Sequence, residues 1–179
     1  SVKETLEDLI KKIRDLLKRV RDENKRLAED NERLNREVEK RNRELIKRIE
    51  DELEEVRKRE DSERVRKIIE DVKRRLDRSH EEVKRISEKN RRDVKRSTEE
   101  LEKLAEDAER RLDELDKLLK DLDIRDLKRE IEKILREIKK ALEDSRRKSK
   151  ETLDRIREVL KTSEEDIKRI LKEIREAAR

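Results

Sequence analysis

The chain has 179 residues, of which 61% are charged, 29% are hydrophobic and none is aromatic, and it contains no glycine, proline, cysteine or methionine. Because 57 basic residues are balanced by 52 acidic ones, the net charge is only +5, and this mixed-sign composition argues against a basic nucleic-acid-binding tail. The lack of cysteine excludes disulfides, and the lack of any apolar run near ~20 residues predicts a soluble protein without a membrane span or targeting signal.

The high charged fraction would, taken alone, predict a disordered chain. Two features oppose that interpretation. The composition is dominated by Glu, Lys, Arg and Leu, which is typical of long helices, and the apolar residues recur strictly at helical spacing. The periodicity therefore predicts a folded, all-α protein.

The first predicted helix covers residues 2–60. Ser1 and Glu4 have the spacing of a capping box, in which a hydroxyl and a carboxylate satisfy free amides of the first turn. The apolar stripe that follows repeats every 18 residues, and four asparagines lie in or beside this stripe, which a helix normally buries. The stripe consists of Leu6, Leu9, Ile13, Leu16, Val20, Asn24, Leu27, Asn31, Leu34, Val38, Asn42, Leu45 and Ile49, with Asn35 beside Leu34.

The second predicted helix covers residues 63–121. Asp61 and Ser62 interrupt the preceding pattern and can cap a new helix, because their side chains accept hydrogen bonds from first-turn amides. The segment 97–100 also resembles a cap, but the apolar register continues through it without glycine or proline, so we expect no break there. The same 18-residue repeat relates Val65, Val83, Leu101 and Leu119, and also Ile68, Ile86, Leu104 and Leu122.

The third predicted helix covers residues 124–178. Asp123 is placed as its N-cap with Asp126 at the third helical position, and Leu122 and Leu127 have the spacing of a hydrophobic staple. The cap-like segment 163–166 again lies inside an unbroken register. The repeat relates Ile124, Leu142, Leu160 and Ala178, and also Ile138, Ile156 and Ile174.

The two short connections predict that neighbouring helices run antiparallel. Eighteen residues in five turns is the natural 3.6-residue period of a straight helix, so we expect long, nearly straight helices with little superhelical twist. The fold class is therefore an all-α, single-chain antiparallel three-helix bundle, with residues 1–179 in one domain. Counting from the turns, residue i of the first helix should lie near residue 123−i of the second and near residue i+124 of the third.

This register brings polar residues of all three helices to shared heights. A buried amide without a partner costs roughly 1–3 kcal/mol, so core asparagines are tolerable only where they satisfy one another. Asn24 comes level with Ser97 and Thr98 and with Ser145 and Ser149. Asn42 comes level with Ser79, His80 and Ser163, and Asn31 and Asn35 come level with Ser87, Asn90 and Thr152. The predicted buried polar network consists of Asn24, Asn31, Asn35, Asn42, Ser79, Asn90, Ser97, Ser145, Ser149, Thr152 and Ser163.

The expected use of these layers is specificity, because a helix shifted by one heptad would set asparagine against leucine and leave donors unpaired. Ser87 and Thr98 lie at flanking positions of the helical wheel, where exposure at the edge of the stripe is as good an interpretation as burial.

No catalytic, cofactor or metal site emerges from the sequence. His80 is the only histidine, and a helical-bundle metal site needs several converging ligands, of which the sequence offers only Asp77 and His80 at i, i+3. We expect His80 to donate to the Asn42 layer or to lie beside it. The locally basic segments 89–96 and 146–150 carry no interleaved aromatic residues and are interrupted by acidic ones, so a solvated helix face is favoured over a nucleic-acid or membrane surface.

With the repeat, the caps and the polar layers placed, the whole chain resembles de novo designed, parametrically generated helical bundles with buried hydrogen-bond networks. The loops depart from that family, which often uses glycine or proline there. The resemblance implies a designed structural scaffold with no catalytic residue, no cofactor and no natural ligand.

Two functions from different classes are predicted. The leading one is a monomeric scaffold that requires no partner. The rival is a three-helix component of a designed hetero- or homo-oligomer that binds a further helix through the third helix, whose apolar face is broader. That face is broadened by Leu135, Ala141, Leu153, Val159, Leu171 and Ala177.

Overall fold

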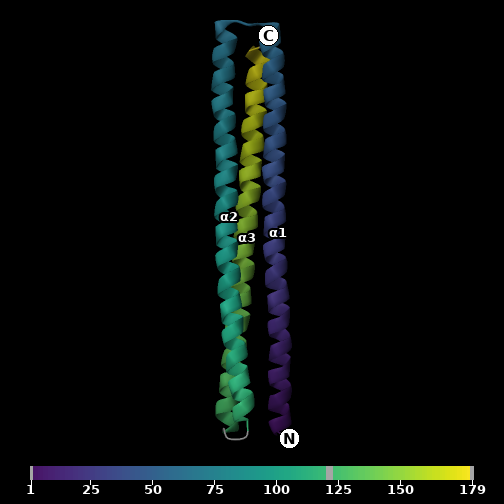
Figure 1. Ribbon diagram of the computed structural model, residues 1–179, viewed down its shortest axis with the longest axis vertical. Coiled ribbons are helices and arrows are strands. Elements are labelled where there is room, and N and C mark those ends of the chain that lie inside the picture. Colours follow the sequence, from purple (N-terminus) through teal and green to yellow (C-terminus); the bar gives the residue numbers. More distant parts are fainter. Residues whose placement is uncertain (1, 120–122, 178–179) are drawn as a thin grey trace. The chain divides into compact units, whose positions relative to one another are not determined.

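The computed structural model describes residues 2–119 and 123–177, which form three helices and no strand. They are α1 (Val2–Arg59), α2 (Glu63–Leu118) and α3 (Ile124–Ala177) (Figure 1). The three-helix bundle expected from the periodicity is confirmed, and both cap-like segments inside α2 and α3 are helical throughout. The second helix was expected to reach residue 121, but α2 ends at Leu118 and residue 119 forms a turn. The proposed Ser1 cap, the Leu122 staple position and the expected end of the third helix at 178 lie outside the described residues.

The starts of α2 and α3 carry the side-chain caps expected from the sequence. The Val65 amide donates to Ser62 Oγ at 3.3 Å, and the Arg66 amide donates to the Ser62 carbonyl at 3.0 Å. At α3, the Arg125 amide donates to Asp123 Oδ1 at 3.2 Å. These side chains occupy amides that have no intrahelical partner, which fixes where each helix begins.

Removal of the Ser62 hydroxyl should weaken the start of α2. We expect Ser62→Ala to lower the free energy of unfolding by about 1 kcal/mol, because the Val65 amide then loses its acceptor. Urea denaturation followed by circular dichroism measures this loss. Ser62→Asp, which keeps an acceptor at the cap, is the matched control and should retain most of the stability; equal losses in both variants would contradict the capping role.

The chain forms two compact units, and each helix contributes a segment to both. Unit 1 comprises Ser1–Asp30 and Asp93–Glu151, and unit 2 comprises Asn31–Arg92 and Thr152–Arg179. Within unit 1, α1 and α2 are antiparallel, since Arg14 pairs with Asp113 and the later residue Asn24 with the earlier residue Thr98.

The core of unit 1 is apolar and is filled by all three helices. Leucine and isoleucine dominate it, and α2 also contributes two buried alanines. Leu9 and Leu16, which the sequence places in the stripe, are half-buried at its edge, while the adjacent Ile10 and Leu17 lie fully inside. The buried residues are Leu6, Ile10, Ile13, Leu17, Val20, Leu101, Ala105, Ala108, Leu112, Leu115, Leu127, Ile131, Ile134 and Ile138.

Unit 2 has two apolar clusters. The smaller one packs Val38 of α1 and Ile156 of α3 with Val83 and Ile86 of α2. Burial of each such side chain contributes roughly 1.5–3 kcal/mol, so these clusters supply the stability that offsets polar groups placed between apolar layers. The larger cluster consists of Ile49, Leu53, Val65, Ile69, Val72, Leu76, Ile167, Ile170 and Ile174.

Candidate functional site: the buried polar layers

The chain contains five asparagines, and all five are buried. Their exposed fractions lie between 0% for Asn90 and 5% for Asn24. Buried hydroxyls accompany them, namely Ser87, Ser145, Ser149, Thr152 and Ser163. Polar side chains are normally kept at the surface of proteins unless they are hydrogen-bonded, so each of these groups needs a partner.

The Asn24 layer lies in unit 1 and joins all three helices. Asn24 Nδ2 donates to the backbone carbonyl of Thr98 on α2 at 3.3 Å. The Ser145 hydroxyl on α3 donates to Asn24 Oδ1 at 3.3 Å. The Thr98 hydroxyl donates to the Val94 carbonyl one turn earlier, so this side chain is used within its own helix. Both ends of the Asn24 amide are therefore satisfied.

The central layer lies in unit 2 and is built around Asn90. Its Nδ2 donates to the Thr152 carbonyl at 3.0 Å and to Asn35 Oδ1 at 3.4 Å. Its Oδ1 accepts from the guanidinium of Arg155 at 3.1 Å. The Thr152 hydroxyl in turn donates to Asn31 Oδ1. The three helices are thus linked through one connected set of side chains.

The Asn42 layer, also in unit 2, is a triangle of one amide and two hydroxyls. Asn42 Nδ2 donates to Ser163 Oγ at 2.7 Å and to Ser79 Oγ at 3.2 Å. The two hydroxyl oxygens lie 2.8 Å apart and are themselves hydrogen-bonded. The Asn42 carbonyl receives no hydrogen bond from the described residues.

The remaining predicted members are placed differently from one another. Ser79 is half-buried and accepts a hydrogen bond from Asn42, as expected. Ser97 is also half-buried, but Asn24 donates to the backbone carbonyl of the neighbouring Thr98 and not to the Ser97 hydroxyl. Ser149 is buried in unit 1 and is hydrogen-bonded or otherwise paired. For Ser87, the position on the helical wheel was compatible with burial and with exposure. Ser87 is fully buried, and its hydroxyl has no hydrogen-bond partner among the described residues.

A single offset relates α1 to α3 in every layer. Asn24, Asn31 and Asn42 each bond a residue 121 positions later. The sequence predicted an offset of 124, so the prediction lies within one helical turn. In unit 2, Asn31 and Asn42 pair with Thr152 and Ser163 in rising order, which makes α1 and α3 parallel.

Ion pairs between exposed and half-buried side chains of α1 and α3 follow a similar alignment. The sequence predicted ion pairs within one helix and did not predict these pairs between helices. Arg146 donates to Glu23 in unit 1, and Arg41 donates to Glu164 in unit 2, each pair being 123 residues apart. The signs are reversed between the two pairs, although the positions differ by one 18-residue repeat. Opposite charges at a constant offset between helices were the signal that would have revealed them.

The half-buried Arg91 of α2 links two carboxylates of α1. Its guanidinium bonds Glu32 at 2.9 and 3.2 Å and also bonds Glu39. The hydrogen bonds from Arg91 lower the pKa of Glu32, against the opposing effect of burial. Because the folded pKa is depressed, this pair stabilises the fold above the ordinary glutamate pKa of ~4.3 and loses that contribution as the pH falls through the folded value.

Arg91→Gln should lower the free energy of unfolding at pH 7 by up to about 1 kcal/mol, since the pair is only partly shielded from water. The difference from wild type should shrink between pH 5 and pH 3, measured by urea denaturation. Arg36→Gln is the matched control, because Arg36 also bonds Glu32 but is 76% exposed. An Arg36→Gln loss as large as that of Arg91→Gln would contradict the assignment.

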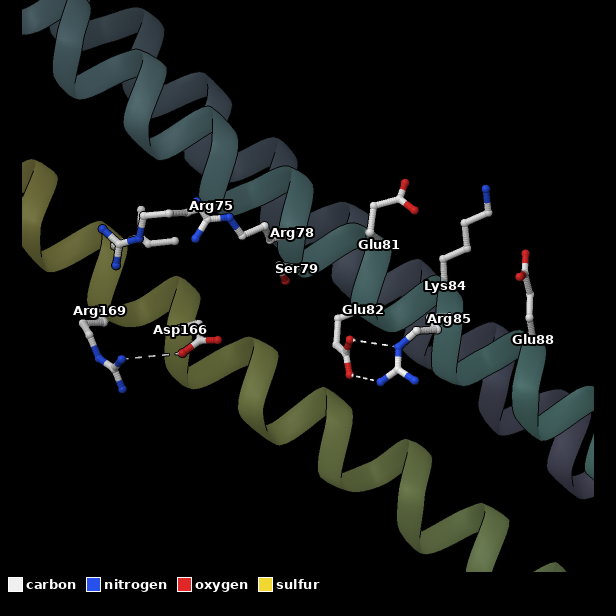
Figure 2. A pocket seen from close by; sticks show the side chains of 11 residues that line it. Arg75, Arg78, Ser79, Glu81, Glu82, Lys84, Arg85, Glu88, Asp166 and Arg169 are labelled. Carbon is white, nitrogen blue, oxygen red and sulfur yellow. Dashed lines mark hydrogen bonds and ion pairs between the residues drawn. The ribbon is translucent and has the colours of Figure 1, made fainter.

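A cavity of about 850 Å³ lies between α2 and α3 in unit 2. Figure 2 shows that its lining is charged, with Glu82 bonded to Arg85 on α2 and Asp166 paired with Arg169 on α3. Arg75 bonds Glu173 across the same two helices. The charges that line this cavity are therefore largely neutralised by their own neighbours, which disfavours it as an anion site.

His80 is exposed and lines a smaller cavity beside the Asn42 layer. Within residues 2–119 and 123–177, no group of three histidine, cysteine, aspartate or glutamate side chains is arranged to hold a metal ion. None of the helices in that part of the chain has an apolar stretch long enough to cross a membrane.

Comparison with known proteins gives no assignment. No protein-family model, curated protein or solved structure matches this chain. The function must therefore be inferred from the three-helix fold and its buried polar layers.

Proposed function

We propose that the chain is a designed structural scaffold without natural biochemical activity, in which buried asparagine, serine and threonine layers fix the alignment of the helices. The observation that carries this proposal is the burial of all five asparagines in hydrogen-bonded layers with one constant offset between α1 and α3. Scattered buried amides would be strongly destabilising, whereas clustered ones stabilise only the arrangement that pairs them.

The layers discriminate against shifted alignments. A shift of α3 by one heptad in either direction would place Asn42 opposite Ile170 or Ile156, which are both almost completely buried. The amide would then lose its two hydroxyl partners and face only apolar groups. At roughly 1–3 kcal/mol for each buried unsatisfied group, each layer adds to the free energy that separates the native alignment from its neighbours.

Three further features support a designed origin. The 18-residue repeat runs through all three helices, whole residue classes are missing from the composition, and the surface is almost entirely Glu, Lys, Arg and Asp. Natural sequences rarely keep a strict period over such lengths without aromatic residues in the core. A designer, by contrast, idealises the backbone first and then places polar networks at chosen heights.

Single leucine substitutions test the scaffold proposal. We expect Asn24→Leu or Asn42→Leu to change the free energy of unfolding little, because the burial of leucine offsets the lost hydrogen bonds of about 1 kcal/mol each. The uniqueness of the fold should suffer instead, seen as doubled or broadened resonances in two-dimensional NMR spectra. A variant that unfolds outright, or one that keeps a single sharp set of resonances, would refute the alignment role.

The rival function, a component of an assembly that binds a further helix through α3, is favoured by the half-buried apolar residues of that helix. Leu135, Val159 and Leu171 nevertheless pack against the cores of their own units. Among the described residues, the only large hydrophobic side chains that are exposed are Val2 and Leu118. Light scattering after size-exclusion chromatography separates the two: a mass near 22.0 kDa supports the scaffold, and a multiple supports the assembly.

A further inference from the structure

Asn42 differs from the other four asparagines in one respect. The carbonyl oxygens of Asn24, Asn31 and Asn35 accept from Ser145, Thr152 and Asn90 respectively. The carbonyl of Asn90 accepts from Arg155. Asn42 is only 1% exposed, and none of the described residues donates a hydrogen bond to its carbonyl oxygen. Buried acceptors in folded proteins are almost always hydrogen-bonded, so a donor is expected there.

Exchange of the amide oxygen and nitrogen does not remove this requirement. In the placement described, both N–H groups of Asn42 are used by Ser79 and Ser163. If the amide were turned by 180°, the carbonyl would accept from the two hydroxyls and the two N–H groups would lose their acceptors. In either orientation, the outer atom of the Asn42 amide needs a partner that the layer itself does not supply.

A cavity of about 260 Å³ lies at this point in unit 2, and Asn42 is one of the residues that line it. Val83 is the one apolar residue that lines it, and His80, Arg43 and Lys84 are among the polar residues that line it. A water molecule occupies about 30 Å³ in the liquid and is held by two to four polar partners. The cavity is therefore large enough for several water molecules and polar enough to hold one in place.

We propose that the Asn42 layer is completed by an ordered water molecule, held in this cavity against the outer atom of the Asn42 amide. Water suits this position because it both donates and accepts, and so it satisfies the amide in either orientation. A cationic donor is disfavoured by the surrounding Arg43, Lys84 and Arg91, and an anion by Glu39 and Glu88. This inference concerns how one layer is satisfied, and the role of the layers in alignment does not depend on it.

A crystal structure of the full chain at a resolution near ~1.2 Å, where amide orientations are assigned with most confidence, tests the proposal. We expect a water oxygen within about 2.6–3.2 Å of the outer Asn42 amide atom. The Asn24 carbonyl is the internal control and should be bonded by Ser145 without water. An outer atom that is dry, or bonded to a protein side chain, would overturn the proposal.

A crystal structure of the His80→Ala variant provides an independent check, because His80 lines the cavity. Removal of the imidazole leaves more room in the cavity, so a water molecule should still be found against the outer Asn42 atom. A protein side chain bonded to that atom instead would equally overturn the proposal. Both crystal structures also show the helix alignment, so failure of the water proposal is distinguishable from failure of the scaffold, which the leucine variants test.

Discussion

Ile134→Asn should lower the free energy of unfolding by roughly 2.5–6 kcal/mol, although five asparagines are already buried in this protein. Ile134 is fully buried among apolar residues of all three helices in unit 1. The substitution removes about 1.5–3 kcal/mol of apolar burial, and it adds an amide with no partner at that height, at about 1–3 kcal/mol. Urea denaturation gives the value, with the slope showing whether the transition remains cooperative.

Ile134→Val is the matched control for this experiment, since it removes one methyl group without adding a polar atom. It should cost about 0.5–1.5 kcal/mol. The difference between the two variants measures the penalty for an asparagine outside a layer. If Ile134→Asn were as mild as Ile134→Val, asparagine would be tolerated anywhere in this core, and position-specific pairing could not be what the asparagine layers provide.

The fold could be predicted in detail because its determinants are local. Apolar spacing set the three helices, and Ser62 and Asp123 act as the caps that the sequence indicated. The layers were predictable because short connections leave little freedom in register, so residues of equal height are fixed by counting. Asn42, Ser79 and Ser163 were brought together in this way, and all three are hydrogen-bonded to one another.

The details that could not be predicted depend on atomic direction, which a count of residues does not contain. Ser97 and Ser79 are equivalent in the repeat, yet Asn24 uses the Thr98 carbonyl where Asn42 uses a hydroxyl. Ser87 lies at a flanking position but is fully buried, because exposure at the edge of a stripe depends on how closely the neighbouring helices approach. The interhelical ion pairs likewise depend on which flank of each helix faces which neighbour.

This difference between equivalent asparagines predicts that aspartate will be tolerated unequally at the two positions. Asn24→Asp should lower the free energy of unfolding at pH 7 by about 3–5 kcal/mol, because a buried carboxylate would face the Thr98 carbonyl, which cannot donate. Asn42→Asp should cost about 2 kcal/mol less, since the hydroxyls of Ser79 and Ser163 can turn to donate to the carboxylate.

The pH dependence provides the sharper measurement. Burial beside an acceptor raises the pKa of the new carboxyl group at position 24, so the protonated form is favoured in the folded state. The loss of stability relative to wild type should therefore be small below the ordinary aspartate pKa of ~3.9 and should grow as the pH rises above it. Urea denaturation of both variants and wild type at pH 3.5, 5 and 7 gives the comparison. Equal losses of stability at the two positions at pH 7 would contradict this prediction. They would mean that the hydroxyls of Ser79 and Ser163 do not turn to donate to the carboxylate, so that positions 24 and 42 are equivalent, as the 18-residue repeat implies.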